Sequence, residues 1–295
     1  MVPDFVVVGA SKAGTTSIYS WLARHPDVAV PYVKDTYFFN NDITPAADAD
    51  YGRLFDPTHV RAGAVTGEVT PSYLDDLHAP GRIRDHAPDA RLILSLREPV
   101  SRIYSWAQMN VRLGTATDLA TETARLAREP RFRVAPSIRA ILAHVPRRQV
   151  LALRFDDLAE DPAATARRVF GFIGVDDTFD IAAEPVHNPG GLPRSEALHR
   201  LLEWKPARRL RRVAPRWAFD VLDRARQANL RPAAALDEDI ARRLRAAFLE
   251  DVRETETLLD LDLSAWIDDE LSAISPRRRR FRLPADIDAR IAAPR

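Results

Sequence analysis

Short apolar runs alternate along this chain with segments whose apolar residues recur at a helical period. The run from Phe5 to Val8 is Phe-Val-Val-Val, and its β-branched residues favour a buried strand. Further strands are predicted at 64–71, 91–96 and 149–155, and helices at 79–86, 100–112, 118–128, 137–144 and 162–173. This alternation predicts an α/β fold of three layers, in which a mainly parallel central sheet lies between helices.

The last third of the chain has a helical pattern and many arginines. Helical signals fill residues 196–260 and are interrupted only by prolines. We expect a single domain over residues 1–267, in which 183–267 is mostly a helical cover, followed by a basic tail at 268–295. The run Arg277 to Arg280 in this tail is more typical of a solvated or docked chain end than of a nucleic-acid site.

The loop after the first strand carries the clearest chemical signal. Residues Gly9 to Thr16 read Gly-Ala-Ser-Lys-Ala-Gly-Thr-Thr and lead into an apolar-periodic segment. Glycines let backbone N–H groups approach an anion, and Thr15 to Ser17 fall where a helix N-terminus has unpaired N–H groups. Lys12 adds a movable charge with three donors. We therefore expect a P-loop-like core that binds a phosphate or sulfate; the alternative is an ordinary strand-to-helix turn with a solvated lysine.

This loop is close to the Walker pattern but does not match it. That pattern places lysine directly after its second glycine, whereas here Lys12 precedes Gly14 and Thr15 follows it. The order of residues weakens the interpretation of the chain as a kinase or another NTPase.

A second anion site is predicted where the strand at 91–96 ends. Arg97 follows that strand directly, at the position where open α/β sheets bind ligands. Ser105 lies eight positions further on, about two helical turns away. A guanidinium binds phosphate bidentately, so a ligand with two separated phosphate groups would fill both this site and the Lys12 loop.

Composition limits the partners. The 295 residues include 43 Lys and Arg against 42 Asp and Glu, so a net charge of +1 gives no overall field that would recruit nucleic acid. Cysteine is absent, no apolar run is long enough to span a bilayer, and the first strand begins almost at once. We therefore expect a soluble cytoplasmic protein, and the excess of arginine and alanine suggests a GC-rich bacterial coding sequence.

The loop sequence Lys-Ala-Gly-Thr-Thr-Ser resembles the 5′-phosphosulfate-binding loop of the sulfotransferases that use 3′-phosphoadenosine 5′-phosphosulfate (PAPS). Other motifs of that family follow in order: Lys34 to Phe39 is similar to K-[DE]-x-x-F-F, Gly67 to Tyr73 to G-E-x-[ST]-P-x-Y, Arg97 to Ser105 to the 3′-phosphate segment, and Arg154 to Leu158 to Y-E-D-L. The resemblance covers roughly residues 4–267. Within the family it is nearest to the bacterial and heparan-sulfate-modifying enzymes.

The resemblance implies a role for each matching residue. Lys12 would stabilise the bridging oxygen of PAPS as its bond to sulfur breaks, and no metal ion is required. The residues implied to hold the two phosphate groups are Ala13, Gly14, Thr15, Thr16 and Ser17 for the 5′-phosphate, and Arg97 and Ser105 for the 3′-phosphate. Asp35 stands where the heparan-sulfate type has its glutamate base and is the first candidate for that role, and Glu68 is the second.

The acceptor is less defined. Val69 replaces a lysine of the heparan-sulfate type, which argues against a highly sulfated polysaccharide. An apolar acceptor wall is expected from four aromatic residues, Phe38, Phe39, Tyr104 and Trp106. A small-molecule, glycan or lipid hydroxyl, or an amine, is compatible with the sequence, and so is any oligomeric state. Two alternatives remain: a P-loop kinase or NTPase, and a nucleotide-binding module without turnover.

Overall fold

The structure is a computed structural model that describes residues 1–55, 60, 63–181, 191–195, 198, 228–231, 233 and 235–267. It divides into two compact units: residues 1–102, 130–187 and 243–274 form the first, and residues 103–129, 188–242 and 275–295 form the second. The single domain expected over 1–267 therefore stays a prediction, and the basic tail at 268–295 lies outside the described residues.

The first unit is built on a parallel sheet of five strands. They are β1 (Phe5–Gly9), β2 (Val28–Ala29), β3 (Val65–Val69), β4 (Arg91–Leu96) and β5 (Val150–Arg154). Their spatial order is β2-β3-β1-β4-β5, and each neighbouring pair is parallel. The predicted α/β class and its four strands are confirmed. The fifth strand, β2, has only two residues and ends just before Pro31, which suits the sheet edge where it lies.

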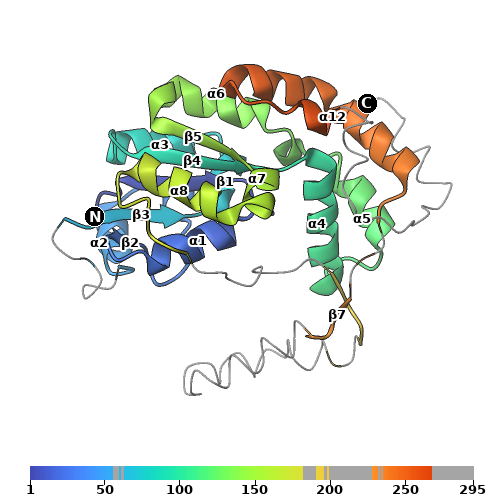
Figure 1. Cartoon of the computed structure of the whole chain (residues 1–295), viewed down its shortest axis with the longest axis horizontal. Helices are drawn as coiled ribbons and strands as arrows, with labels where there is room; N and C mark the ends of the chain where they lie inside the picture. The colour runs from blue at the N-terminus through green and yellow to red at the C-terminus, as the bar shows by residue number, and fades with distance from the viewer. Residues whose placement is uncertain are drawn as a thin grey trace. The chain divides into compact units, whose positions relative to one another are not determined.

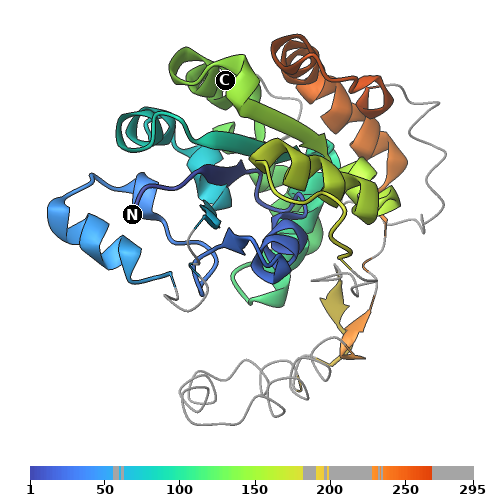
Figure 2. The ribbon, with the colours of Figure 1, turned by 60° about the vertical axis from the view of Figure 1, so that its left-hand side comes forward.

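Helices cover both faces of this sheet. The helices that lie mostly or wholly in the first unit are α1 (Thr15–Arg24), α2 (Pro45–Gly52), α3 (Ala79–His86), α6 (Ala135–His144), α7 (Phe155–Glu160), α8 (Pro162–Ile173) and α12 (Glu238–Leu259), with short 3-10 turns η1 (Phe38–Asn40), η2 (Pro71–Asp75), η3 (Pro130–Phe132), η4 (Arg147–Gln149) and η5 (Ser264–Trp266). Side chains of α1 and α8 form one core with β1, β3, β4 and β5. Figures 1 and 2 show α3 and α6 against the opposite face, which completes the predicted three layers.

The ends of α8 show how local sequence sets these helices. Asp161 caps its N-terminus by accepting the Ala164 N–H at 2.8 Å, and Pro162 occupies the first turn. Gly174, with φ 86°, ends it in the left-handed conformation. Helix α7 is absent from the sequence prediction; Asp156 and Asp157 form its first turn, where acidic side chains stabilise a helix.

The described part of the second unit contains most of α4 (Pro99–Arg112), α5 (Leu119–Leu126) and a short hairpin of β6 (Leu192–Pro193) and β7 (Leu230–Arg231). The predicted helices at 100–112 and 118–128 are confirmed by α4 and α5. Most of the helical region expected at 196–260 lies outside the described residues, apart from α12. None of the helices that the structure describes is long and apolar enough to cross a bilayer.

We predict that Gly67→Ala destabilises the first unit. Gly67 pairs with Phe5 across β1 and β3, and a Cβ at this position would clash with three ring atoms of Phe5, which is fully buried. Overpacking of a core typically costs about 1–3 kcal/mol, measured here by urea denaturation. Gly52→Ala is the control, because its nearest atom would be 3.7 Å away and stability should not fall. Equal effects of the two changes would contradict the packing argument.

Candidate functional site

The loop between β1 and α1 turns its peptide oxygens toward the rest of the protein. Three consecutive carbonyls accept side-chain donors from β4 and the residues after it: Ser11 from Arg102 Nε at 3.2 Å, Lys12 from Arg97 at 3.1 Å and Ala13 from the Ser95 hydroxyl at 2.5 Å. The N–H groups of Thr15 and Thr16 precede the hydrogen-bond ladder of α1, whereas the Ser17 N–H already donates to the Gly14 carbonyl at 3.0 Å. With the carbonyls held elsewhere, this end of α1 suits an anion.

Backbone conformation allows the loop its tight path. Lys12 has φ 68° and Gly14, the residue before α1, has φ 82°. A Cβ on Gly14 would lie 3.0 Å from Leu158 and 3.1 Å from Phe155. A larger residue at Gly14 is therefore disfavoured by both conformation and space.

Arg97 joins the loop to the end of β4. Its guanidinium donates to the Lys12 carbonyl and lies 4.4 Å from the centre of the Phe155 ring. Burial lowers the pKa of Arg97, and the charges of Glu98 and Asp156 partly offset that effect. A bound anion would compensate for the loss of hydration of this cation.

The structure brings most of the predicted donor-site residues together, with one exception. Residues 12–17 and Arg97 lie in the first unit, after β1 and β4 respectively. Ser105 is partly buried on α4 and belongs to the second unit, so its pairing with Arg97 stays a prediction.

Asp35 lies on the turn between β2 and η1, which contacts the last residue of β3. Its backbone N–H donates to the Val69 carbonyl at 3.1 Å, and Lys34 Nζ donates to its carboxylate at 2.7 Å. Asp35 and Tyr37 both have positive φ, at 65° and 57°. Such conformations cost of order 1–3 kcal/mol each outside glycine and occur where surrounding contacts impose them. With its side chain 37% exposed, Asp35 is accessible to an acceptor.

Glu68 has the opposite environment. Its side chain is 0% exposed and accepts hydrogen bonds from the hydroxyls of Thr36, Thr70 and Tyr73. Burial raises the pKa of Glu68, and these hydrogen bonds partly lower it again. Of the two candidate bases, only Asp35 reaches the surface in this conformation.

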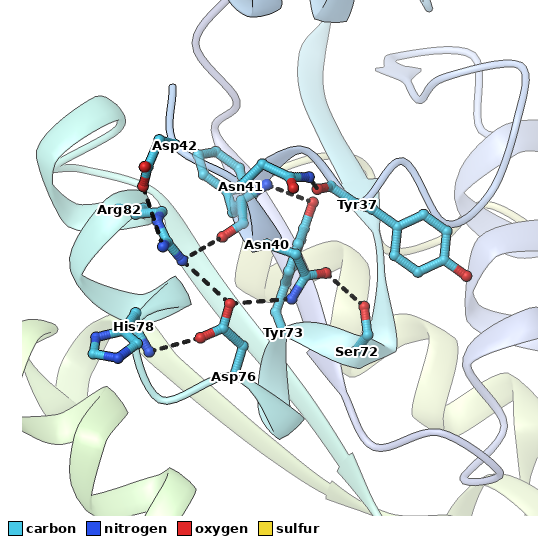
Figure 3. Close-up of polar contacts among 10 residues, drawn as sticks. Tyr37, Asn40, Asn41, Asp42, Ser72, Tyr73, Asp76, His78 and Arg82 are labelled. Atoms are coloured by element: carbon cyan, nitrogen blue, oxygen red, sulfur yellow. Dashed lines mark hydrogen bonds and ion pairs between the residues drawn. The ribbon is translucent and has the colours of Figure 1, made fainter. Parts of the chain in front are cut away.

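A polar network fixes the far end of the same turn (Figure 3). Asn40 accepts the Ser72 hydroxyl at 2.7 Å and donates to Asp76 at 3.3 Å. Asp76 in turn pairs with Arg82 at 3.2 Å, which also contacts Asp42 at 3.3 Å. The network ties η1 to η2 and α3.

The prediction that Phe38 and Phe39 line an acceptor wall is wrong. Phe38 is 9% exposed and Phe39 is fully buried, and both pack against Tyr51. Two tyrosines of the same segment are exposed instead, Tyr32 at 66% and Tyr37 at 52%; Figure 3 shows the Tyr37 ring pointing away from the network. Tyr104 and Trp106 lie in the second unit, and their role stays a prediction.

Sequence reasoning missed the residues that brace the loop. Ser95 is fully buried and interrupts an otherwise apolar strand, which was a visible signal. Arg102 is 1% exposed and also donates to the Arg131 carbonyl at 3.3 Å, a role that its position in a helical pattern did not suggest. Among the residues that the structure describes, no group of three or more His, Asp or Glu side chains is placed to hold a metal ion.

Comparison with known proteins identifies relatives of this arrangement. The model of the "Sulfotransferase family" matches residues 51–180. Heparan sulfate glucosamine 3-O-sulfotransferase 3B1 of Homo sapiens is 30% identical over 187 residues, 59% of this chain and 46% of the relative. Membrane-associated sulfotransferase kil1 of Dictyostelium discoideum is 30% identical over 112 residues, 38% of this chain and 24% of the relative. The chain thus spans less than half the length of these two relatives.

A solved structure covers more of the fold. The crystal structure of a sulfotransferase from Alicyclobacillus acidocaldarius aligns with a TM-score of 0.61 and 26% sequence identity, over 90% of this chain and 99% of that one. Its similarity extends well beyond the matched segment of the family model.

We predict that Glu68→Gln removes a pH dependence of stability. Because the pKa of Glu68 is raised in the folded state, the folded protein binds this proton more readily than the unfolded chain. The wild type therefore loses stability relative to Glu68→Gln as pH rises above about 4.3, by at most about 1.4 kcal/mol per pH unit, until the folded pKa is passed. Urea unfolding of both proteins across this range measures the difference, and a difference that is constant with pH would contradict the prediction.

Proposed function

We propose that this chain, which resembles the sulfotransferase family, transfers a sulfuryl group from PAPS to a hydroxyl or amine of an acceptor. One observation carries this proposal: the loop carbonyls are held by side chains from β4 and the residues after it, beside the N-terminus of α1 and Lys12. The relatives support the reaction class.

The donor would be held by charges at two strand ends. The start of α1, from Gly14 to Ser17, suits the 5′-phosphate, and Arg97 suits the 3′-phosphate; a part for Ser105 stays a prediction from the sequence. Bound there, PAPS would supply an activated sulfuryl group. The task of Lys12 is to stabilise the negative charge that develops on the leaving phosphate. Independence of metal ions is part of the proposal.

The acceptor would lose its proton to Asp35. This carboxylate is accessible and lies at the same sheet edge as the loop, since β1, β3 and β4 are parallel. Exposed Tyr32 and Tyr37 flank it and offer apolar contact to a small-molecule, glycan or lipid acceptor. Val69 is buried, so this position presents no charge to a polyanion. A cytoplasmic location and a bacterial origin stay predictions from the sequence.

We predict that the desulfated nucleotide, 3′-phosphoadenosine 5′-phosphate, binds tightly without metal ions, and that Arg97→Ala weakens binding. Hydrogen bonds to a charged group contribute about 1.5–3 kcal/mol, so the affinity should fall roughly 10- to 150-fold. Isothermal titration calorimetry in EDTA measures it. Arg53→Ala is the control, because Arg53 is an exposed cation paired only with Asp50 among the described contacts.

The same titration separates the alternatives. The wild type should bind a nucleotide that lacks the 3′-phosphate more weakly than the full ligand. Arg97→Ala should bind these two nucleotides equally well. Stronger binding of ATP with magnesium, together with indifference to the 3′-phosphate, would replace the proposal by the NTPase alternative.

We predict that Asp35→Asn retains nucleotide binding and loses transfer. General base catalysis contributes typically 10²- to 10⁴-fold, so turnover should fall by about that factor. Release of 3′-phosphoadenosine 5′-phosphate from PAPS, followed with water alone and with 4-nitrophenol, an alkyl glucoside and an aliphatic amine as acceptors, measures turnover. Asp42→Asn, an exposed carboxylate on the next turn, is the matched control. Full turnover in Asp35→Asn would exclude Asp35 as the base.

A further inference from the structure

We propose that Glu68 is a positioning residue: it orients the turn that carries Asp35 and acts through the hydroxyls of Thr36, Thr70 and Tyr73. The inference rests on the proposed function, in which Asp35 takes the proton of the acceptor. It gives the second candidate base a different task, because Glu68 has no exposed surface with which to touch an acceptor.

The hydroxyl groups around Glu68 direct their protons at its carboxylate. The Glu68 carboxylate accepts from the hydroxyls around it, and in its ionised form it can only accept, so each of those hydroxyls then donates to it. Thr70 Oγ1 lies 2.9 Å from Glu68 Oε2, the Tyr73 hydroxyl lies 3.1 Å from both carboxylate oxygens, and Thr36 Oγ1 also donates to Oε2. In that form three hydroxyls point their protons at one buried group, although Thr36 Oγ1 also lies 3.4 Å from Thr70 Oγ1 and 3.1 Å from the Tyr73 hydroxyl.

The oxygens of the same three hydroxyls accept backbone N–H groups of the turn. Each receives one backbone N–H from the turn: Thr70 Oγ1 from Thr36 at 3.0 Å, Thr36 Oγ1 from Phe38 at 3.3 Å and the Tyr73 hydroxyl from Phe39 at 3.2 Å. Because their protons are taken by Glu68, these oxygens face the turn with lone pairs only. The carboxylate thereby fixes three peptide groups that it does not contact itself.

The backbone conformation of the turn requires these hydrogen bonds. Asp35 and Tyr37, which bracket Thr36, hold left-handed φ values of 65° and 57°. The Asp35 N–H is fixed separately, on the Val69 carbonyl at 3.1 Å. The hydroxyl contacts fix the peptides that follow, so together they define the direction of the Asp35 side chain. Without the carboxylate a hydroxyl can turn its proton toward the peptide N–H it now accepts, which breaks that contact.

The test compares substitutions that keep shape but alter the hydrogen-bond pattern. Glu68→Gln places an amide donor against hydroxyls that already donate. Thr70→Val removes the acceptor of the Thr36 N–H, and Thr70→Ser keeps it as the conservative variant. Glu122→Gln is the matched control, since Glu122 is a 7% exposed carboxylate that accepts from Asn110 and Arg125, both outside the turn.

The first readout is amide hydrogen exchange, which requires no acceptor. In Glu68→Gln and Thr70→Val we expect exchange at Thr36, Phe38 and Phe39 to rise at least tenfold, with no change in α1 or β4. Thr70→Ser and Glu122→Gln should match the wild type. Unchanged exchange in the turn, or a rise spread over the whole first unit, would overturn the proposal in favour of no role or a purely structural one.

The second readout is turnover of PAPS with water and the three acceptors named above. We expect Glu68→Gln and Thr70→Val to lower kcat at least tenfold, with KM for PAPS within twofold of wild type, and Thr70→Ser to restore the rate. A fall confined to KM would contradict the proposal. If the wild type transfers no sulfuryl group while the exchange pattern appears as expected, the proposed function fails and the positioning of the turn stands. If the wild type is active and Glu68→Gln has the same kcat, the positioning role fails and the proposed function stands.

Discussion

The site depends on one constraint, which is where the peptide oxygens of the first loop point. A loop that leads into a helix N-terminus presents either carbonyls or N–H groups to a ligand, and only N–H groups attract an anion. Here Ser95, Arg97 and Arg102 hold the carbonyls of three successive residues. The positive end of α1 is thereby kept clear of these three negative carbonyl dipoles, which suits it to an anion.

The parallel sheet brings the remaining chemistry to the same place. The carboxyl ends of β1, β3 and β4 meet at one edge, and the Thr70 N–H, just beyond β3, donates to the Val7 carbonyl of β1 at 3.0 Å. The donor loop, the Asp35 turn and Arg97 are therefore neighbours by topology. In the proposed function the buried Glu68 carboxylate holds the backbone of the turn, while the Asp35 carboxylate faces solvent.

The sequence predicts what is encoded locally. An apolar β-branched run and a small-residue loop before a helix are each contained in a few neighbouring residues, so the sheet and the turn from β1 into α1 were predicted correctly. β2 (Val28–Ala29) was missed because two residues give no periodicity, and the prediction for Phe38 was wrong because spacing does not reveal which side of a turn is buried. The contact of Glu68 with Thr36 joins positions 32 residues apart, which no local pattern records.

A crystal structure of the complex with 3′-phosphoadenosine 5′-phosphate would show whether the loop between β1 and α1 binds the donor. We expect the 5′-phosphate on the backbone N–H groups at the start of α1, with Lys12 beside it, the 3′-phosphate on Arg97, and loop carbonyls still bound to Ser95 and Arg102. A nucleotide bound elsewhere, or a loop that flips its carbonyls toward the ligand, would contradict this expectation.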